Sequence, residues 1–125
     1  MSTMDARLRE GIRLFNERQF FASHEALESF YRETEAENKA FLEGLIQLAA
    51  AFRMFSEFGE VKGPVRMMYQ ALIRFENFPP AYLQIRVKEL CQAVESWAKA
   101  AEASDKTPAP SDIPKIQLQR FSPFS

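Results

Sequence analysis

The stretch FLEGLIQLAAAF, residues 41–52, decides the fold because its apolar side chains cover most of a helical circumference. A surface helix carries one apolar stripe, whereas a helix that is apolar nearly all round is enclosed by other elements. Asn38 is the expected N-cap and Gly59 the expected stop, which places a helix over about residues 39–58. The apolar run is too short for a membrane span, which needs about 20 residues. The sequence therefore predicts a central core helix.

Four more segments have a 3.6-residue apolar period, two before this helix in the sequence and two after it. We expect helices over about residues 4–16, 21–35, from Pro64 to the Phe-Pro-Pro at 78–80, and over 81–103. Gly11 and Gly44 lie inside helical patterns and each costs about 1 kcal/mol relative to alanine. We therefore expect both glycines where two helices cross closely. The predicted fold class is all-α: a single-domain antiparallel bundle of about five helices over residues 1–104.

The composition changes after residue 104 into an extended, Pro-rich C-terminal tail, residues 105–125. Its composition allows a disordered tail, whereas its four sizeable apolar side chains favour a docked one. A docked tail could pack against the bundle or against a neighbouring subunit. Twelve phenylalanines in 125 residues are many for one small core. We expect some of them to line a homodimer contact or a tail-docking groove. The apolar tail residues are Ile116, Leu118, Phe121 and Phe124, and the other candidates for an exposed contact are Phe55, Phe58 and Phe78.

The charge pattern narrows the class of partner. Formal net charge is −1, and lysines and arginines are scattered among acidic residues. We therefore expect neither a nucleic acid nor a membrane as partner. With a single cysteine, Cys91, the chain cannot form an internal disulfide. Secreted domains of this size often rely on such bridges, so we expect the protein in the cytoplasm. Cys91 falls on a helical apolar stripe, so we interpret it as a packing residue rather than a nucleophile.

The only histidine, His24, lies in FFASHEALESFY, residues 20–31. Positions 20, 24, 27 and 31 form one helical stripe, which predicts that His24 faces inward, with Glu28 one turn further on. Gln47 of the central helix could supply amide donors and acceptors. These groups form either a structural polar contact between two helices or a ligand pocket. The expected cluster comprises His24, Glu25, Glu28, Tyr31 and Gln47.

Two kinds of chemistry are alternatives at this cluster. A His-x3-Glu spacing suits metal ligation, but it supplies two ligands, and a metal would need Glu25 or Glu43 plus water. Arg18 and His24 have the Arg-x5-His spacing of some small helical ribonucleases, whereas no nucleophile constellation is readable. We expect no metal, no cofactor and no catalytic residue. A metal-assisted hydrolase or a ribonuclease that uses His24 remains the enzymatic alternative.

Several motifs together are similar to a known family. LFNERQFFASHEALESFY, FLEGLIQLAAAF and GPVRMMYQAL resemble the bacterial and archaeal domain-of-unknown-function family 309 over roughly residues 11–78. Tyr31 stands where that family usually has tryptophan, which keeps an aromatic body with a polar tip. The resemblance implies an all-helical bundle without an assigned activity. The matching residues are Phe15, Asn16, Phe20, His24, Glu25, Glu28 and Gly44 to Gln47.

These observations predict a small cytoplasmic binding module, not clearly an enzyme, with a polar groove near His24. Its partner would be a protein or a small molecule. A tetratricopeptide-like scaffold of helical hairpins is the second hypothesis, because residues 11–30 have small and aromatic residues near that repeat's spacing. Only one such unit is readable in the sequence, and solenoids need about three.

Overall fold

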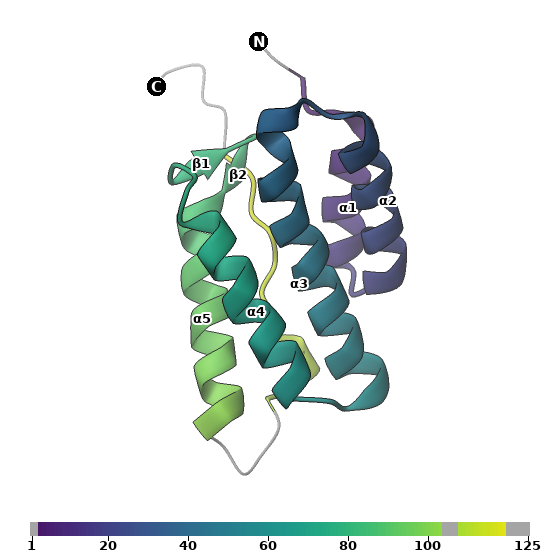
Figure 1. The fold of residues 1–125 in the computed structure, drawn as a ribbon. Coiled ribbons are helices and arrows are strands. Elements are labelled where there is room, and N and C mark those ends of the chain that lie inside the picture. Colours follow the sequence, from purple (N-terminus) through teal and green to yellow (C-terminus); the bar gives the residue numbers. More distant parts are fainter. Residues whose placement is uncertain (1–2, 104–107, 120–125) are drawn as a thin grey trace.

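The computed structural model describes residues 3–103 and 108–119, and does not describe 1–2, 104–107 and 120–125 (Figure 1). The described residues form five α-helices and one small hairpin, so the predicted all-α bundle of about five helices is confirmed. Two short 3₁₀ turns, Ala36–Asn38 and Pro110–Asp112, complete the described elements. The helices are α1 (Ala6–Asn16), α2 (Phe20–Glu33), α3 (Lys39–Phe58), α4 (Lys62–Phe75) and α5 (Val87–Ala103), and the strands are β1 (Ala81–Tyr82) and β2 (Ile85–Arg86).

Helix α3 lies at the centre of the bundle. Its buried side chains include Phe41, Leu45 and Phe52, each without exposed surface. Helices α2 and α4 both pack on α3, while α1 packs on α2 and α5 packs on α4, so each helix packs mainly against its neighbours in sequence. Gly59 ends α3 in the left-handed conformation, with φ of 67°, as expected for a helix stop. Within the part of the chain that the structure describes, no helix is long and apolar enough to cross a membrane.

The starts of α1 and α4 differ from the prediction. Asp5 caps α1, because its Oδ1 accepts the backbone N–H of Arg7 at 2.8 Å, and α1 therefore begins after it rather than at Met4. Asn38 occupies the predicted N-cap position of α3, but its side chain forms no capping hydrogen bond. Its backbone is helical rather than extended, and its side chain instead donates to Thr34 Oγ1 at 2.9 Å. Helix α4 begins two residues before Pro64.

The largest departure precedes α5. Residues 81–86, predicted to be helical, form the antiparallel hairpin β1–β2, and the helix begins only at Val87. The two turn residues, Leu83 and Gln84, have φ of 49° and 66°. A type I′ hairpin turn requires positive φ at both positions and usually selects Asn or Gly. Because neither residue type is present, the local sequence gives no hairpin signal and the apolar spacing of Leu83 and Val87 suggests a helix.

The described part of the tail packs against its own chain. Ile113 and Ile116 are buried in the same core as the helices, and Leu118 forms an antiparallel bridge with Ile85 of β2. Figure 1 shows this segment in yellow, running along the bundle toward the hairpin. Phe121 and Phe124, which we also expected to dock, lie outside the described residues.

The other phenylalanines divide between core and surface. Phe55, expected at an exposed contact, is buried with its ring centroid 4.7 Å from that of Trp97. Phe78 packs on Phe41 at 5.2 Å between centroids. Phe58 and Phe21 are 62% and 48% exposed. Burial of Phe55 was hard to foresee because its partner, Trp97, comes from α5, 42 positions later in the sequence.

The two helical glycines mark close helix crossings, as predicted. A Cβ atom at Gly11 would lie 2.6 Å from Cδ2 of Leu27, and one at Gly44 would lie 2.6 Å from Cε1 of Phe75. Real Cβ atoms are not found this close to another heavy atom. Gly44 therefore allows the Phe75 ring of α4 to lie directly against the backbone of α3.

We expect Gly44→Ala to lower the free energy of unfolding by about 1–3 kcal/mol, because the new methyl group overpacks against Phe75. Gly63→Ala is the matched control, since its Cβ would meet Met54 Cε at an ordinary 3.6 Å. The control should be neutral or slightly stabilising. Urea denaturation measures both changes, and a Gly44→Ala protein as stable as the wild type would contradict the close crossing.

Candidate functional site

Helix α2 presents a different inward stripe from the predicted one. Its buried residues are Phe20, Ser23, Leu27 and Phe30, whereas His24 and Tyr31 are only partly buried. The Ser23 hydroxyl donates to the carbonyl of Gly11 at 2.7 Å. This short, satisfied side chain lets α1 approach α2 closely, and the inward face moves by one residue. The predicted stripe is thus wrong in placing His24 in the core, whereas the prediction that His24 is at least partly buried is confirmed, because it borders the core.

Four of the five predicted site residues nevertheless line one cavity. The cavity has a volume of about 420 Å³ and includes His24, Glu28, Tyr31 and Gln47 in its lining. It brings together residues of α2, α3 and α4. The fifth predicted residue, Glu25, is exposed and does not line it. The remaining lining residues are Glu43, Ile46, Ala50, Met67 and Arg74.

A chain of hydrogen bonds connects one set of polar groups in this cavity. Glu43 is its centre: Oε1 accepts from the Tyr31 hydroxyl at 2.8 Å, and Oε2 accepts from Arg74 Nη1 at 2.6 Å. Arg74 Nε also donates to Gln47 Oε1 at 3.3 Å, and Gln47 Nε2 donates to Gln70 Oε1 at 2.7 Å. The three helices thus hold these side chains in fixed positions relative to one another.

His24 and Glu28 form a second polar group. His24 Nε2 lies 3.2 Å from Glu28 Oε2, and Glu28 Oε1 accepts from Arg32 at 3.1 Å. About a third of the His24 side-chain surface, 33%, is exposed. The predicted role of Gln47 as partner of this pair is wrong, because its amide bonds to Gln70 and Arg74.

Sequence reasoning missed Arg74 as a lining residue. The available signal was the spacing of Met67, Gln70 and Arg74, which are three and four positions apart and so share one face of a helix. What the sequence could not supply was that this face of α4 turns toward Glu43.

The pKa of the Tyr31 phenol is shifted by its carboxylate partner, Glu43. The hydrogen bond to Glu43 raises the pKa of Tyr31 above its ordinary value, since the bond favours the neutral phenol, and partial burial adds to this effect. Lys39 Nζ lies 4.4 Å from the Tyr31 ring centroid and donates to the Tyr31 carbonyl at 2.7 Å. Tyr31 is thereby held as a hydrogen-bond donor on this wall of the cavity.

Arg18, which the ribonuclease alternative pairs with His24, is engaged elsewhere. Arg18 does not line the cavity, and its Nη2 donates to the Ile113 carbonyl at 2.6 Å. Among residues 3–103 and 108–119, no group of three or more His, Cys, Asp or Glu side chains is placed to hold a metal ion. Burial raises the pKa of the Cys91 thiol to about 11, so this thiol is protonated near neutral pH.

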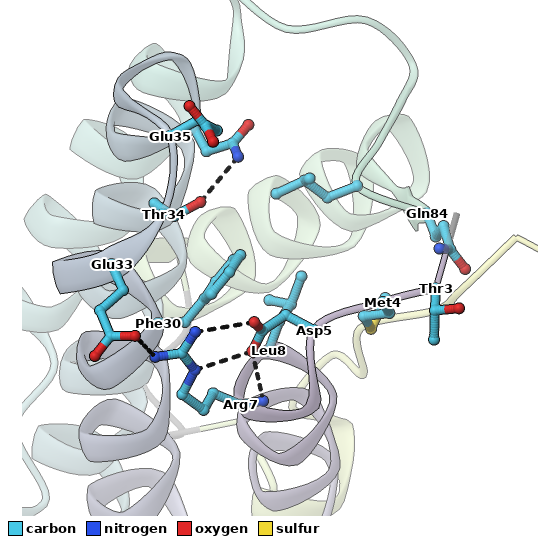
Figure 2. A pocket seen from close by; sticks show the side chains of 12 residues that line it. Thr3, Met4, Asp5, Arg7, Leu8, Phe30, Glu33, Thr34, Glu35 and Gln84 are labelled. Carbon is cyan, nitrogen blue, oxygen red and sulfur yellow. Dashed lines mark hydrogen bonds and ion pairs between the residues drawn. The ribbon is translucent and has the colours of Figure 1, made fainter. Parts of the chain in front are cut away.

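A second cavity, of about 510 Å³, lies at the opposite side of α2, near the start of α1 and the hairpin turn (Figure 2). Figure 2 shows Arg7 between two acids: its guanidinium bonds Asp5 Oδ2 at 2.9 Å and Glu33 Oε2 at 2.7 Å. The Arg7 guanidinium carbon also lies 5.6 Å from the Phe30 ring centroid. These charges are paired with one another, and none of the predicted site residues is among the lining residues.

The fold and the first cavity define an all-α protein with a polar cavity against its central helix. Residues 8–67 match the family model described as Domain of unknown function (DUF309). The match confirms the resemblance that the sequence motifs indicated, and it covers the residues from α1 into α4. No curated protein matches this chain.

We expect Glu43→Gln to lower the pKa of Tyr31 toward its ordinary value, because the phenol loses its charged acceptor. A raised pKa means that the folded state binds this proton more tightly than the unfolded state does. The resulting stabilisation is present below about pH 10 and is lost as the pH rises through the raised pKa. The variant should therefore lose less stability at alkaline pH.

NMR titration of ¹³Cζ-labelled tyrosine measures the change. Tyr82 is the internal control, since its pKa is raised chiefly by burial and should not move. A Tyr31 pKa that is the same in both proteins would contradict the Tyr31–Glu43 hydrogen bond.

Proposed function

We propose that this protein is a binding module and that the cavity between α2, α3 and α4 takes a small ligand. The observation that carries the proposal is the convergence of His24, Glu28, Tyr31 and Gln47 on one cavity. Its volume of about 420 Å³ falls in the range of small-molecule sites, about 300–1,000 Å³. Sites of this kind combine an apolar surface with a few fixed polar groups.

The lining supports a ligand with an apolar body and polar ends. Ile46, Ala50 and Met67 supply apolar surface. Around them lie donors on Arg74 and Tyr31 and acceptors on Glu43 and Glu28, the first three already fixed by their mutual hydrogen bonds. Side chains that are positioned before binding lose less conformational entropy when a ligand arrives. This arrangement favours a binding role over a purely structural polar contact, because a structural contact needs no adjoining cavity.

A peptide-binding scaffold of helical hairpins is the second candidate. It is favoured by the sequential packing of the helices, each mainly on its neighbours, and by the extended segment of the tail that lies among them. Helical solenoids pack in this way and present a groove for extended partners. This candidate places the partner in the groove that the tail fills and leaves the cavity at His24 without a role.

The cytoplasm is the compartment that we propose for this function. The single, partly buried Cys91 supports it, because secreted domains of this size commonly depend on disulfides.

Ala50→Leu tests the proposed ligand site by filling the cavity with a larger side chain. The probe is a set of fragments, each with an aromatic or aliphatic body and one amine or carboxylate, screened by ¹H–¹⁵N chemical-shift changes. We expect shifts that centre on Ile46, Gln47 and Met67, and binding at least about tenfold weaker in Ala50→Leu.

Ala40→Leu is the matched control, because Ala40 is exposed on the same helix and does not line the cavity. It should bind the fragments as the wild type does. Fragments that bind nowhere near the cavity, or that bind Ala50→Leu as tightly as the wild type, would rule out the proposed site.

A further inference from the structure

The second cavity, of about 510 Å³, is built by four separate parts of the chain. They are the start of α1 with the residues before it, the end of α2, the 3₁₀ turn that follows α2, and the turn of the hairpin β1–β2. Figure 2 shows Glu33 and Glu35 on one side of this cavity, Gln84 on the other, and Leu8 and Phe30 between them. Leu8 and Phe30 belong to the hydrophobic core. The apolar surface of the cavity is therefore the edge of the core.

Hydrogen bonds of Arg7 fix the wall between α1 and α2. Its Nε and Nη2 donate to the two carboxylate oxygens of Asp5 at 3.0 and 2.9 Å, and its Nη1 donates to Glu33 Oε2 at 2.7 Å. Asp5 also caps α1. One guanidinium thus joins the start of α1 to the end of α2 at the border of the cavity.

Asn38 fixes the wall between α2 and the hairpin. Its side chain is buried, donates to Thr34 Oγ1 at 2.9 Å and accepts from the Tyr82 hydroxyl. On the hairpin itself, the Gln84 carbonyl accepts the Gln119 N–H at 2.8 Å. Walls that are held in this way keep their shape without a ligand, so less conformational entropy is lost when a ligand binds.

The hairpin turn that forms one wall has a strained backbone. Leu83 and Gln84 both line the cavity, and both have a positive φ, which residues with a side chain rarely adopt. Strained residues persist only where the surrounding structure holds them, and they are concentrated at functional sites. The strained turn therefore adds to the support for a site at this cavity.

The charges of the lining favour a cation. The lining has three carboxylates, those of Asp5, Glu33 and Glu35, and one guanidinium, that of Arg7. The hydrogen bond from Arg7 lowers the pKa of Asp5, so Asp5 is ionised near neutral pH. Among the residues that the structure describes, the Glu35 carboxylate has no ion-pair partner. The lining thus has an excess of negative charge, which attracts cations and repels anions.

We propose that this cavity is a second binding site and that it takes a small organic amine with an apolar body. The ammonium group lies at the carboxylates of Glu33 and Glu35, where the negative charge is in excess. The apolar body contacts Phe30 and Leu83. A volume of about 510 Å³ is in the range of small-molecule sites, about 300–1,000 Å³. This inference concerns a different cavity from the one at His24 and does not depend on the ligand proposed there.

Three probes of similar shape and different charge test the proposal on the full-length protein. They are 2-phenylethylamine, the neutral 2-phenylethanol and the anionic 3-phenylpropionate, each titrated while ¹H–¹⁵N chemical shifts are recorded. We expect the amine to shift the signals of Phe30, Thr34 and Leu83, and we expect the alcohol and the anion to bind there at least about threefold more weakly. Equal binding of the three probes overturns the proposal. So does an amine whose shifts occur only at Ile46, Gln47 and Met67, because it would occupy the cavity at His24.

Glu35→Gln removes one carboxylate from the lining and keeps the size of the side chain. It should weaken binding of 2-phenylethylamine about two- to fivefold, as expected for an ion pair near the surface. Glu37→Gln is the matched control, because Glu37 is an exposed acid two positions further on that does not line the cavity. The control should bind the amine as the wild type does. Glu35→Gln binding as tightly as the wild type, or both variants weakened alike, overturns the proposal.

Ala50→Leu separates the two cavities, because it fills the one at His24 and lies outside the lining of this one. We expect the amine to shift the signals of Phe30, Thr34 and Leu83 in this variant as it does in the wild type. Loss of these shifts would place the amine in the cavity at His24 and overturn the present proposal. Retained shifts support it whether or not the site at His24 binds a ligand.

Discussion

The structure depends on the enclosure of α3. This helix is apolar on nearly every side, so it can be stable in water only when other elements cover it all round. Helices α2 and α4 supply most of that cover, and the contact with α4 is close because Gly44 leaves room for the Phe75 ring. The positions of the remaining elements follow, since α1 packs on α2 and α5 packs on α4.

In sequential packing of this kind, the first and last helices, α1 and α5, each pack mainly against one other helix. The tail adds to this packing, because Ile113 and Ile116 are buried in the same core as the helices. Its backbone is satisfied by Asn16 and Arg18 on one side and by strand β2 on the other. The hairpin and the tail thus stabilise each other, because each supplies the hydrogen-bond partners that the other lacks.

The polar cavity exists where α3 is least apolar. Glu43 and Gln47 lie one turn apart on α3 and take partners from both neighbouring helices, Tyr31 on α2 and Arg74 and Gln70 on α4. Charged and polar side chains at the border of a core need such partners, because a buried group without one is costly. A polar network beside a cavity is also what a ligand site needs. The same side chains therefore join the helices and line the proposed ligand site.

The sequence by itself determined the elements whose signal is local and periodic. The all-α class, the extent of α3 and the two glycine crossings were predictable, because helical periodicity and the cost of a helical glycine act within a few residues. Most of the candidate cluster was also predictable, since a lone histidine beside carboxylates on an aromatic helix is unusual.

Only the tertiary structure decided the rest. The turn at Leu83 and Gln84 carries no local signal, and the strand it forms is stabilised by residues more than thirty positions later, at the bridge to Leu118. Ser23 rather than His24 faces inward because its partner, the Gly11 carbonyl, belongs to another helix. Asn16 binds a residue that lies 100 positions away. Such choices depend on which groups meet in space, and no window of sequence contains both partners.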